Sequence, residues 1–343
     1  MEDLIQLDSY PVQTTLRILL QDKTTKKNII WATDSYASFG EAYTDRSQIT
    51  ANQLKKMNYG MIQPRISKDM KQQTQRTRKS AEVFTPAWIC NKMNNFCDEE
   101  WFGYKDVFNQ QAEHEWISTE DKIRFPDGKR WEEYIDSRRL EITCGEAPYL
   151  VSRYDASTGN MIDIHKRIGI LDRKLRVVNE NTADETEWLK WTIRAFQSVY
   201  GYEYQGDNLL IARINLLMTF VDYMNSKWHR QPEKAELRKV ANIISWNIWQ
   251  MDGLKGTVPM GVLKEEYHQM SLFESFQDVE EDNVPEVRCK IFAWKGYDFD
   301  ILNQLDNKDY IRQGSHRSKS MYITKEGEAK AKELMEKYNV ADW

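Results

Sequence analysis

One glycine and two carboxylates in the middle of the sequence are residue types that can bind a small polar ligand. Gly145, Glu203 and Asp252 each end or directly follow a short apolar run that is typical of a strand. A glycine after a strand lets a ligand approach the backbone closely, and a carboxylate accepts hydrogen bonds from vicinal hydroxyls or an amino group. Open parallel sheets bind ligands at the carboxyl ends of their strands, where all three positions would lie.

The kind of ligand follows from what these turns contain. The stretch LEITCGEAPYL has one glycine, whereas the dinucleotide pattern has three, so a ligand without a pyrophosphate is favoured. Glu203 fits the two hydroxyls of a ribose, Tyr204 could pack on a purine, and Asp252 could accept from an adenine amino group. Taken singly, a surface carboxylate and a common Asp-Gly turn are the simpler interpretations; their order along the chain argues for a site.

Alternating strand and helix patterns from Arg138 onward predict the elements that position these residues. The predicted strands are Leu140–Thr143, Ser198–Glu203 and Ile243–Trp249. The predicted helices are Glu187–Gln197, Asn208–Met224 and Pro232–Ala241. Strands separated by helices favour an α/β fold with a doubly wound, mostly parallel sheet.

Two further helices are expected nearer the N-terminus. The first spans Pro11 to Leu20. The second follows Thr85 as N-cap and Pro86 as first helical residue, with apolar residues at helical spacing from Ile89 to Cys97. A basic tract from Arg65 to Lys79 lies between them.

Composition shifts divide the sequence into four predicted regions. These are an N-terminal region with the basic tract (1–80), a ligand-binding domain (81–262), an acidic linker (263–287) and a small C-terminal segment (288–343). In the last region a short strand meets a helix capped by Thr324, which resembles part of a winged-helix module or is simply a capped helix.

Charge and composition narrow the class of protein. With 343 residues and a net charge of −5, the chain is not a uniformly basic nucleic-acid binder, although a local basic patch can still act. Its four cysteines form no CxxC pair, so neither a structural zinc site nor a disulfide framework is indicated, and no metal is implied. No apolar run or basic leader points to a membrane or to secretion, and we expect a cytoplasmic protein.

Four segments together carry a resemblance to a known family. EVFTPAWI, EITCGEAPYL, YGYEYQGDNLLIARINLL and NIWQMDGL resemble the S-adenosylmethionine-binding portion of adenine-N6 DNA methyltransferases. The similar proteins are the gamma-class enzymes of restriction-modification systems, in which the cofactor motifs come first. The resemblance covers about Lys79 to Pro259. It implies a Rossmann-like methyltransferase fold, S-adenosyl-L-methionine as cofactor, and methyl transfer to adenine in DNA.

The resemblance also implies roles for individual residues. Those around the methionine portion of the cofactor would be Phe84, Thr85 and Pro86. Those beneath the first strand would be Thr143, Cys144, Gly145 and Ala147, in place of the more common proline, alanine, cysteine and glycine run. Glu203 would hold the ribose, Tyr204 would flank the adenine ring and Asp252 would bind its amino group.

One departure concerns the transfer step itself. The family transfers the methyl group at an Asn-Pro-Pro-Tyr or Asp-Pro-Pro-Tyr tetrapeptide, and this sequence has neither, so no catalytic residue is predicted. The adenine amine is a poor nucleophile that needs positioning and acceptors. Three interpretations therefore stay open: a methyltransferase or its cofactor-binding portion, a non-catalytic subunit or regulator with the same fold, and a Rossmann-like domain with another ligand.

DNA binding would need a basic groove and an aromatic pocket for a flipped adenine. The candidate phosphate contacts in the basic tract are Arg65, Lys71, Arg76, Arg78 and Lys79, and the segment SHRSKS at 315–320 is a second candidate. A solvated surface is the alternative for both. The expected partners are DNA and a restriction or specificity subunit.

Overall fold

The chain divides into two compact units, Met1–Leu263 and Lys264–Trp343. The computed structural model describes residues 4–57, 62–70, 73–74, 76–77, 85–253, 255–261, 308, 311–313, 321–323, 326, 329–330 and 333. In the second unit, β6 (Ile311–Gln313) pairs antiparallel with β7 (Met321–Ile323). The predicted acidic linker and Thr324 lie outside the described residues.

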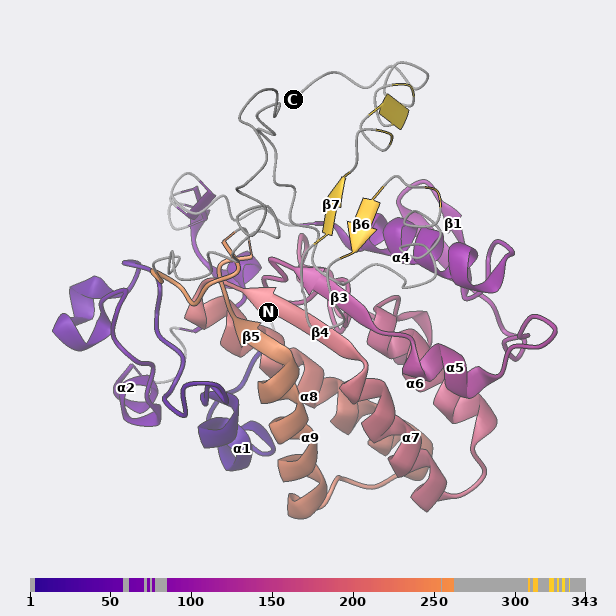
Figure 1. Ribbon diagram of the computed structural model, residues 1–343. Coiled ribbons are helices and arrows are strands. Elements are labelled where there is room, and N and C mark those ends of the chain that lie inside the picture. The colour runs from indigo at the N-terminus through magenta and orange to yellow at the C-terminus, as the bar shows by residue number, and fades with distance from the viewer. Residues whose placement is uncertain are drawn as a thin grey trace, which may run out of the picture. The chain divides into compact units, whose positions relative to one another are not determined.

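A three-stranded parallel sheet lies at the centre of the first unit (Figure 1). Its strands are β3 (Arg139–Ile142), β4 (Val199–Glu203) and β5 (Ile248–Gln250), in the order β3-β4-β5. Because the strands are parallel, their carboxyl ends lie at one edge, and Ile142 stands opposite Tyr202 there. The predicted α/β class is thus confirmed.

Two helix pairs return the chain to the start of the next strand (Figure 1). Between β3 and β4 run α6 (Ile170–Asn181) and α7 (Glu185–Gln197), and between β4 and β5 run α8 (Gly206–Trp228) and α9 (Lys234–Asn247). Asp184 caps α7 by accepting from Glu187 N at 2.9 Å. A capping box between Glu233 and Glu236 starts α9.

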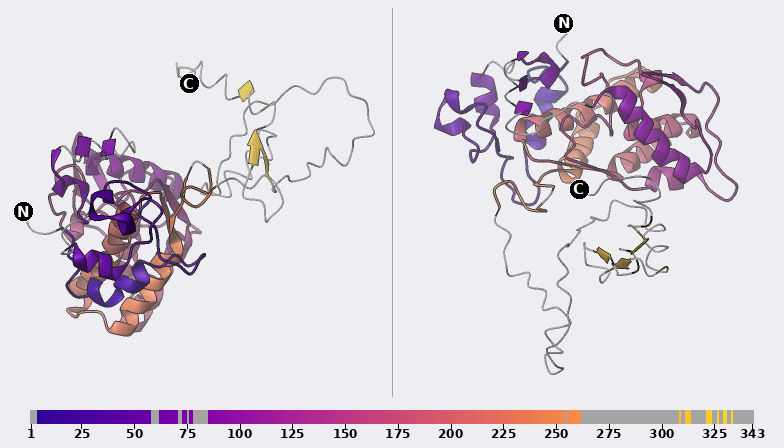
Figure 2. Two further views of the ribbon diagram at one scale, coloured as in Figure 1. Left: turned by 90° about the vertical axis from the view of Figure 1, so that its left-hand side faces the viewer. Right: turned by 90° about the horizontal axis from the view of Figure 1, so that it is seen from above.

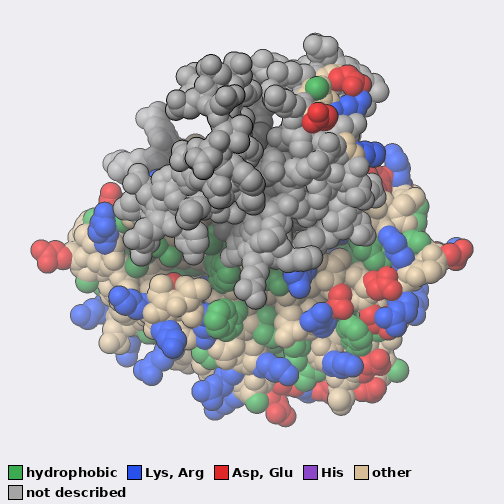
Figure 3. Space-filling model, in the orientation of Figure 1, with side chains coloured by type: hydrophobic (Ala, Val, Ile, Leu, Met, Phe, Trp, Pro, Cys, Tyr) green, Lys and Arg blue, Asp and Glu red, His purple; other side chains and the backbone are tan. Residues whose placement is uncertain are grey.

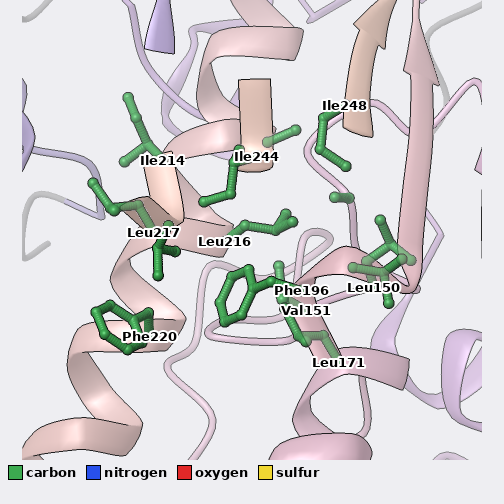
Figure 4. Packing of buried hydrophobic residues seen from close by; sticks show 14 of the residues in the cluster. Leu150, Val151, Leu171, Phe196, Ile214, Leu216, Leu217, Phe220, Ile244 and Ile248 are labelled. Atoms are coloured by element: carbon green, nitrogen blue, oxygen red, sulfur yellow. The ribbon is translucent and has the colours of Figure 1, made fainter. Parts of the chain in front are cut away.

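The core forms around α8, which packs against β4 and β5 and against α1, α6 and α9. Apolar side chains of α8, α9 and the turn after β3 converge there, among them Ile214, Phe220, Ile244 and Leu150 (Figure 4). The helix α8 is buried nearly all round, as its sequence predicts. Burying each large apolar side chain contributes about 1.5–3 kcal/mol, so this helix organises the unit.

The third strand begins later than predicted. Residues 243–247 continue α9, and the strand is limited to Ile248–Gln250. The buried positions of α9 (Leu237, Val240, Ala241, Ile244) keep a helical period through this stretch, so the apolar run that was assigned to a strand completes a helix face.

The helix after the basic tract forms as expected but buries another face. It is α4 (Ala87–Phe102), and Pro86, not Thr85, is its N-cap residue. The apolar residues at helical spacing do not form the buried side: Met93 and Phe96 are more than half exposed. Asn91 and Asp98 are buried instead, because they bind a buried arginine of α6.

That arginine belongs to α6, a helix that the sequence analysis did not predict. In α6, Asp172, Arg173 and Lys174 are consecutive and all buried, which hides the apolar period. Arg173 donates to Asp98 Oδ2 at 2.5 Å and to Asn91 Oδ1 at 2.8 Å, both on α4. The helix α5 (Trp131–Asp136) and the hairpin of β1 (Asn109–Ala112) and β2 (Glu115–Ser118) were also not predicted.

The N-terminal residues pack into the same unit. Helix α1 (Val12–Leu19), predicted from its apolar pattern, lies beside α9 (Figures 1 and 2), and a second short helix, α2, spans Ala51–Lys56. The backbone at Ile30 crosses the start of α8 so closely that a Cβ at Gly206 would lie 2.0 Å from Ile30 O. Only glycine can occupy that position without displacing the crossing segment.

One buried side chain ties α1, α8 and β5 together. Arg213 of α8 is 1% exposed and donates to Leu19 O at 2.5 Å, to Gln21 O at 3.0 Å and to Ile248 O at 2.7 Å. Its charge is thus dispersed over backbone carbonyls at the end of α1 and at the start of β5.

We expect Arg213→Met to lower the free energy of unfolding by about 3 kcal/mol or more, because several buried carbonyls lose their donor. Urea unfolding would measure the loss. The exposed Arg238→Met on α9 is the control and should change stability by less than about 0.5 kcal/mol. Equal losses in the two variants would contradict the structural role of Arg213.

Candidate functional site

The first two predicted positions meet at the carboxyl edge of the sheet. Gly145 N donates to Glu203 Oε2 at 2.8 Å, and Gln205 N donates to Glu203 Oε1 at 3.0 Å. Glu203 is 6% exposed. Its carboxylate therefore joins the turn after β3 to the end of β4 and is held in one orientation.

The turn after β3 has a strained backbone. Thr143, Gly145 and Ala147 have φ values of 55°, 53° and 65°. Positive φ in a β-branched residue such as Thr143 is rare and costs on the order of 1 kcal/mol or more. Strain of this kind persists where the surroundings fix it, and it concentrates at ligand sites.

The shape of the turn leaves space beside Gly145. A Cβ added there would meet no described atom within 4 Å, although φ would strain any other residue. Cys144 and Ala147 are buried, and burial raises the pKa of the Cys144 thiol well above its usual value. Cys144 is therefore a neutral packing residue beneath a turn whose glycine has space beside it among the described residues.

The third predicted position lies at the same edge. A Cβ at Gly253 would lie 2.9 Å from Ile142 Cγ2, so the turn after β5 sits directly against the end of β3. Asp252 Oδ1 accepts from Lys255 N at 3.1 Å, and its side chain is 18% exposed. Tyr204 is half-buried beside Glu203, and its carbonyl accepts from Gln250 at 2.9 Å.

Helix α4 is attached to the same turn. Asn94, midway along α4, donates to Tyr149 O at 2.9 Å, and Thr85 lies next to the Tyr149 side chain. Ala87 N, next to Pro86, donates to Asp155 Oδ2 at 3.1 Å. Thr85 and Pro86 thus lie near the turn after β3, and Phe84 is outside the described residues.

Sequence reasoning missed one carboxylate here. Glu141 in β3 accepts from Leu150 N at 3.2 Å, and burial, together with the nearby charge of Glu203, raises the pKa of Glu141 to about 8. The available signal was an acidic residue inside an otherwise apolar strand. Glu141 places a second, largely protonated carboxyl group beneath the turn near neutral pH.

The basic tract has a different environment from the one expected. Arg76 is 4% exposed, and its Nη1 lies 2.9 Å from Asp207 Oδ2, which also pairs with Lys68 at 3.3 Å. Burial alone would raise the pKa of Asp207, but these two charges outweigh it and lower the pKa. The backbone of Arg65, itself 7% exposed, donates to Glu146 Oε1 at 2.7 Å.

Neither described arginine of the tract lies on an exposed face, because Asp207 and Glu146 bind them into the unit. This burial favours a structural role over the phosphate contacts or solvated face that the sequence suggested. Lys71, Arg78, Lys79 and the segment 315–320 lie outside the described residues. On the face shown in Figure 3, basic and acidic side chains alternate over the described surface.

Comparison with known proteins gives one match. The family described as "Domain of unknown function (DUF6429)" matches residues 277–341, which lie in the second unit. No match was found among curated proteins, and none among solved structures. Within the described residues, no helix has the length and apolar character to cross a bilayer, and no group of three His, Cys, Asp or Glu side chains could hold a metal.

The raised pKa of the half-buried Glu141 predicts a pH dependence. Its pKa is about 8 in the folded chain against an ordinary 4.5, so it favours the folded state at low pH, and this contribution is lost as pH rises from about 4.5 through 8. Across that window the wild type should lose on the order of 3 kcal/mol more than Glu141→Gln. Urea unfolding at several pH values measures this, with the exposed Glu115→Gln as control. Parallel curves for wild type and Glu141→Gln would contradict it.

The buried Arg76 predicts a stability defect. We expect Arg76→Gln to lower the free energy of unfolding by about 3 kcal/mol, since Asp207 would stay buried with one cation fewer. Thermal unfolding would be compared with Arg17→Gln, an exposed substitution on α1 that should change little. An unchanged melting temperature in Arg76→Gln would contradict a structural role for Arg76.

Proposed function

We propose that this chain binds S-adenosyl-L-methionine at the carboxyl edge of its parallel sheet and serves adenine-N6 methylation of DNA in a restriction-modification system. It would do so as the methyltransferase or as its cofactor-binding portion. The observation that carries the proposal is the hydrogen bond from Gly145 N to Glu203 Oε2, which brings together two segments predicted separately from the sequence. The turn at 251–253 and helix α4, through Asn94, lie around the same edge.

The chemistry of the edge suits a nucleoside with an amino-acid tail. A carboxylate has about four acceptor sites, so Glu203 can orient itself on backbone amides and still accept from ribose hydroxyls. Tyr204 beside it offers an aromatic ring to the adenine, and Asp252 offers an acceptor to the adenine amino group. Thr85 and Pro86, near Tyr149, would face the methionine end.

The strand order supports the proposal of a Rossmann-like fold. The order β3-β4-β5 follows the sequence in one direction, as one half of a doubly wound sheet does. In that architecture the ligand crevice opens beside the first strand, here β3, whose last residue Ile142 is 47% exposed. We therefore propose a Rossmann-like methyltransferase fold of which the described strands form one half.

A second candidate function rests on the absent tetrapeptide. Without an Asn-Pro-Pro-Tyr or Asp-Pro-Pro-Tyr segment in the sequence, the acceptors that would draw the adenine amine toward the methyl group are not supplied by that motif. The chain would then be a subunit or regulator that binds cofactor and DNA, with transfer depending on another polypeptide.

Cofactor binding is the decisive test. Calorimetry with S-adenosyl-L-methionine should show binding by the wild type, and Glu203→Gln should weaken it about tenfold or more, because hydrogen bonds to a charged acceptor become neutral ones. Glu115→Gln, exposed on β2, is the matched control and should bind as the wild type does. No binding by the wild type, or equal affinity in Glu203→Gln, would remove the cofactor assignment.

The two candidate functions separate in a transfer assay. Tritiated methyl transfer to unmethylated duplex DNA by the chain alone supports the methyltransferase. Transfer that requires a candidate partner subunit supports the second function.

A further inference from the structure

Two neighbouring helices of the first unit carry basic side chains on their outer surface. Helices α7 and α9 pack side by side (Figure 1). A groove with a volume of about 570 Å³ is lined mainly by α7, with Lys190, Trp191 and Arg194, and by Lys239 of α9. Its described lining includes no residue of β3, β4, β5 or the turns that follow them, so the groove is distinct from the carboxyl edge of the sheet.

The basic residues of both helices recur at a spacing that brings like charges together. Lys190 and Arg194 are four residues apart on α7, and Lys234 and Arg238 are four residues apart on α9. All four side chains are exposed. Residues four apart share one face of a helix, where two like charges destabilise it. A bound partner of negative charge would remove this repulsion on both helices.

Nearby carboxylates neutralise little of this charge. Arg230 binds Glu185 at the start of α7 and Glu236 at the start of α9, the latter at 2.7 Å. In the groove, Asp136 pairs with Arg194. Within the described part of the chain, no ion pair forms with the other basic residues of this surface, Lys190, Lys234, Arg238 and Lys239. A local excess of positive charge therefore lies on a chain whose net charge is −5.

The loop 22–27 after α1 extends the basic surface. Lys23 Nζ donates to Asn242 Oδ1 at 2.8 Å, which attaches the loop to α9. Lys26 and Lys27 of the same loop are exposed. Trp246, one turn after Asn242 on the same face of α9, is 51% exposed. An exposed aromatic ring among lysines and arginines is typical of surfaces that bind nucleic acids, because the ring packs on a base or sugar beside the bound phosphates.

The extent of this surface favours a polymer over a small anion. Lys234 and Arg238 are separated by about 6 Å along the axis of α9, since a helix rises about 1.5 Å per residue. A single phosphate or carboxylate could contact one such pair. Only a ligand with regularly repeated negative charges could contact α7, α9 and the loop 22–27 together, as the backbone of a nucleic acid does.

We propose that the basic surface formed by α7, α9 and the loop 22–27 binds the phosphate backbone of DNA. The lysine and arginine side chains replace cations condensed on the phosphates, so binding is independent of base sequence and weakens as salt is added. This inference rests on the charge of the surface and not on the proposed methyl transfer. It places phosphate contacts on α7 and α9, whereas Arg65 and Arg76 of the basic tract are buried.

Fluorescence anisotropy of the full chain with a labelled DNA duplex of about 30 base pairs tests the proposal. The wild type should bind with a Kd of about 1–100 μM near physiological salt, and more weakly as salt is added. The double variant Lys190→Gln/Lys239→Gln should bind about fivefold more weakly or worse, and its plot of log affinity against log salt should be less steep by about two. No binding by the wild type at about 50 mM salt overturns the proposal.

A matched control separates the location from the loss of net charge. The double variant Lys92→Gln/Lys122→Gln removes two exposed lysines from α4 and from the loop after β2, and it should bind DNA as the wild type does. Equal weakening in both double variants overturns the location. Tighter binding to vesicles that contain phosphatidylserine than to DNA overturns the choice of a nucleic acid. Calorimetry with S-adenosyl-L-methionine reports on the other edge of the unit, so failure of DNA binding and failure of cofactor binding can be told apart.

Discussion

The carboxylate of Glu203 is the interaction on which the candidate site depends. It accepts from Gly145 N and Gln205 N and so fixes the strained turn after β3 against the end of β4. The same turn, with Thr143, Gly145 and Ala147 at positive φ, is also held by Cys144 N, which donates to Tyr202 O at 2.8 Å. The neighbouring Glu141 has a pKa raised to about 8, chiefly because desolvation disfavours its charged form and secondly because of the charge of Glu203.

Elsewhere in the first unit, too, buried charged side chains connect elements that are distant in sequence. Asp207 at the start of α8 binds Arg76 and Lys68, and Arg213 further along α8 binds carbonyls next to α1 and β5. Helix α8 is thus both the apolar centre of the core and the element that orders the N-terminal residues. A buried charge without its partners destabilises the fold. Each of these contacts therefore favours one arrangement of the elements that it joins.

Sequence patterns predicted the elements whose burial follows a simple period. The strands β3 and β4 and the helices α1, α7 and α8 lie where apolar spacing placed them, and Glu203 and Gly145 lie together as strand ends in a parallel sheet must. Patterns failed where polar side chains are buried. Helix α6 was missed because Asp172, Arg173 and Lys174 interrupt its apolar face, and the buried face of α4 was misjudged because its partner is Arg173. The pairing of Arg76 with Asp207 spans 131 residues and leaves no local signal.

The contact between α4 and α6 has a consequence for how the chain can be divided. Arg173 binds Asp98 and Asn91, which precede it in the sequence by 75 and 82 residues. A fragment that begins after α4 would contain every strand of the parallel sheet and yet leave this guanidinium buried and uncompensated. We therefore expect such a fragment to be less stable than one that includes α4, because removing one partner of a buried ion pair leaves an uncompensated charge.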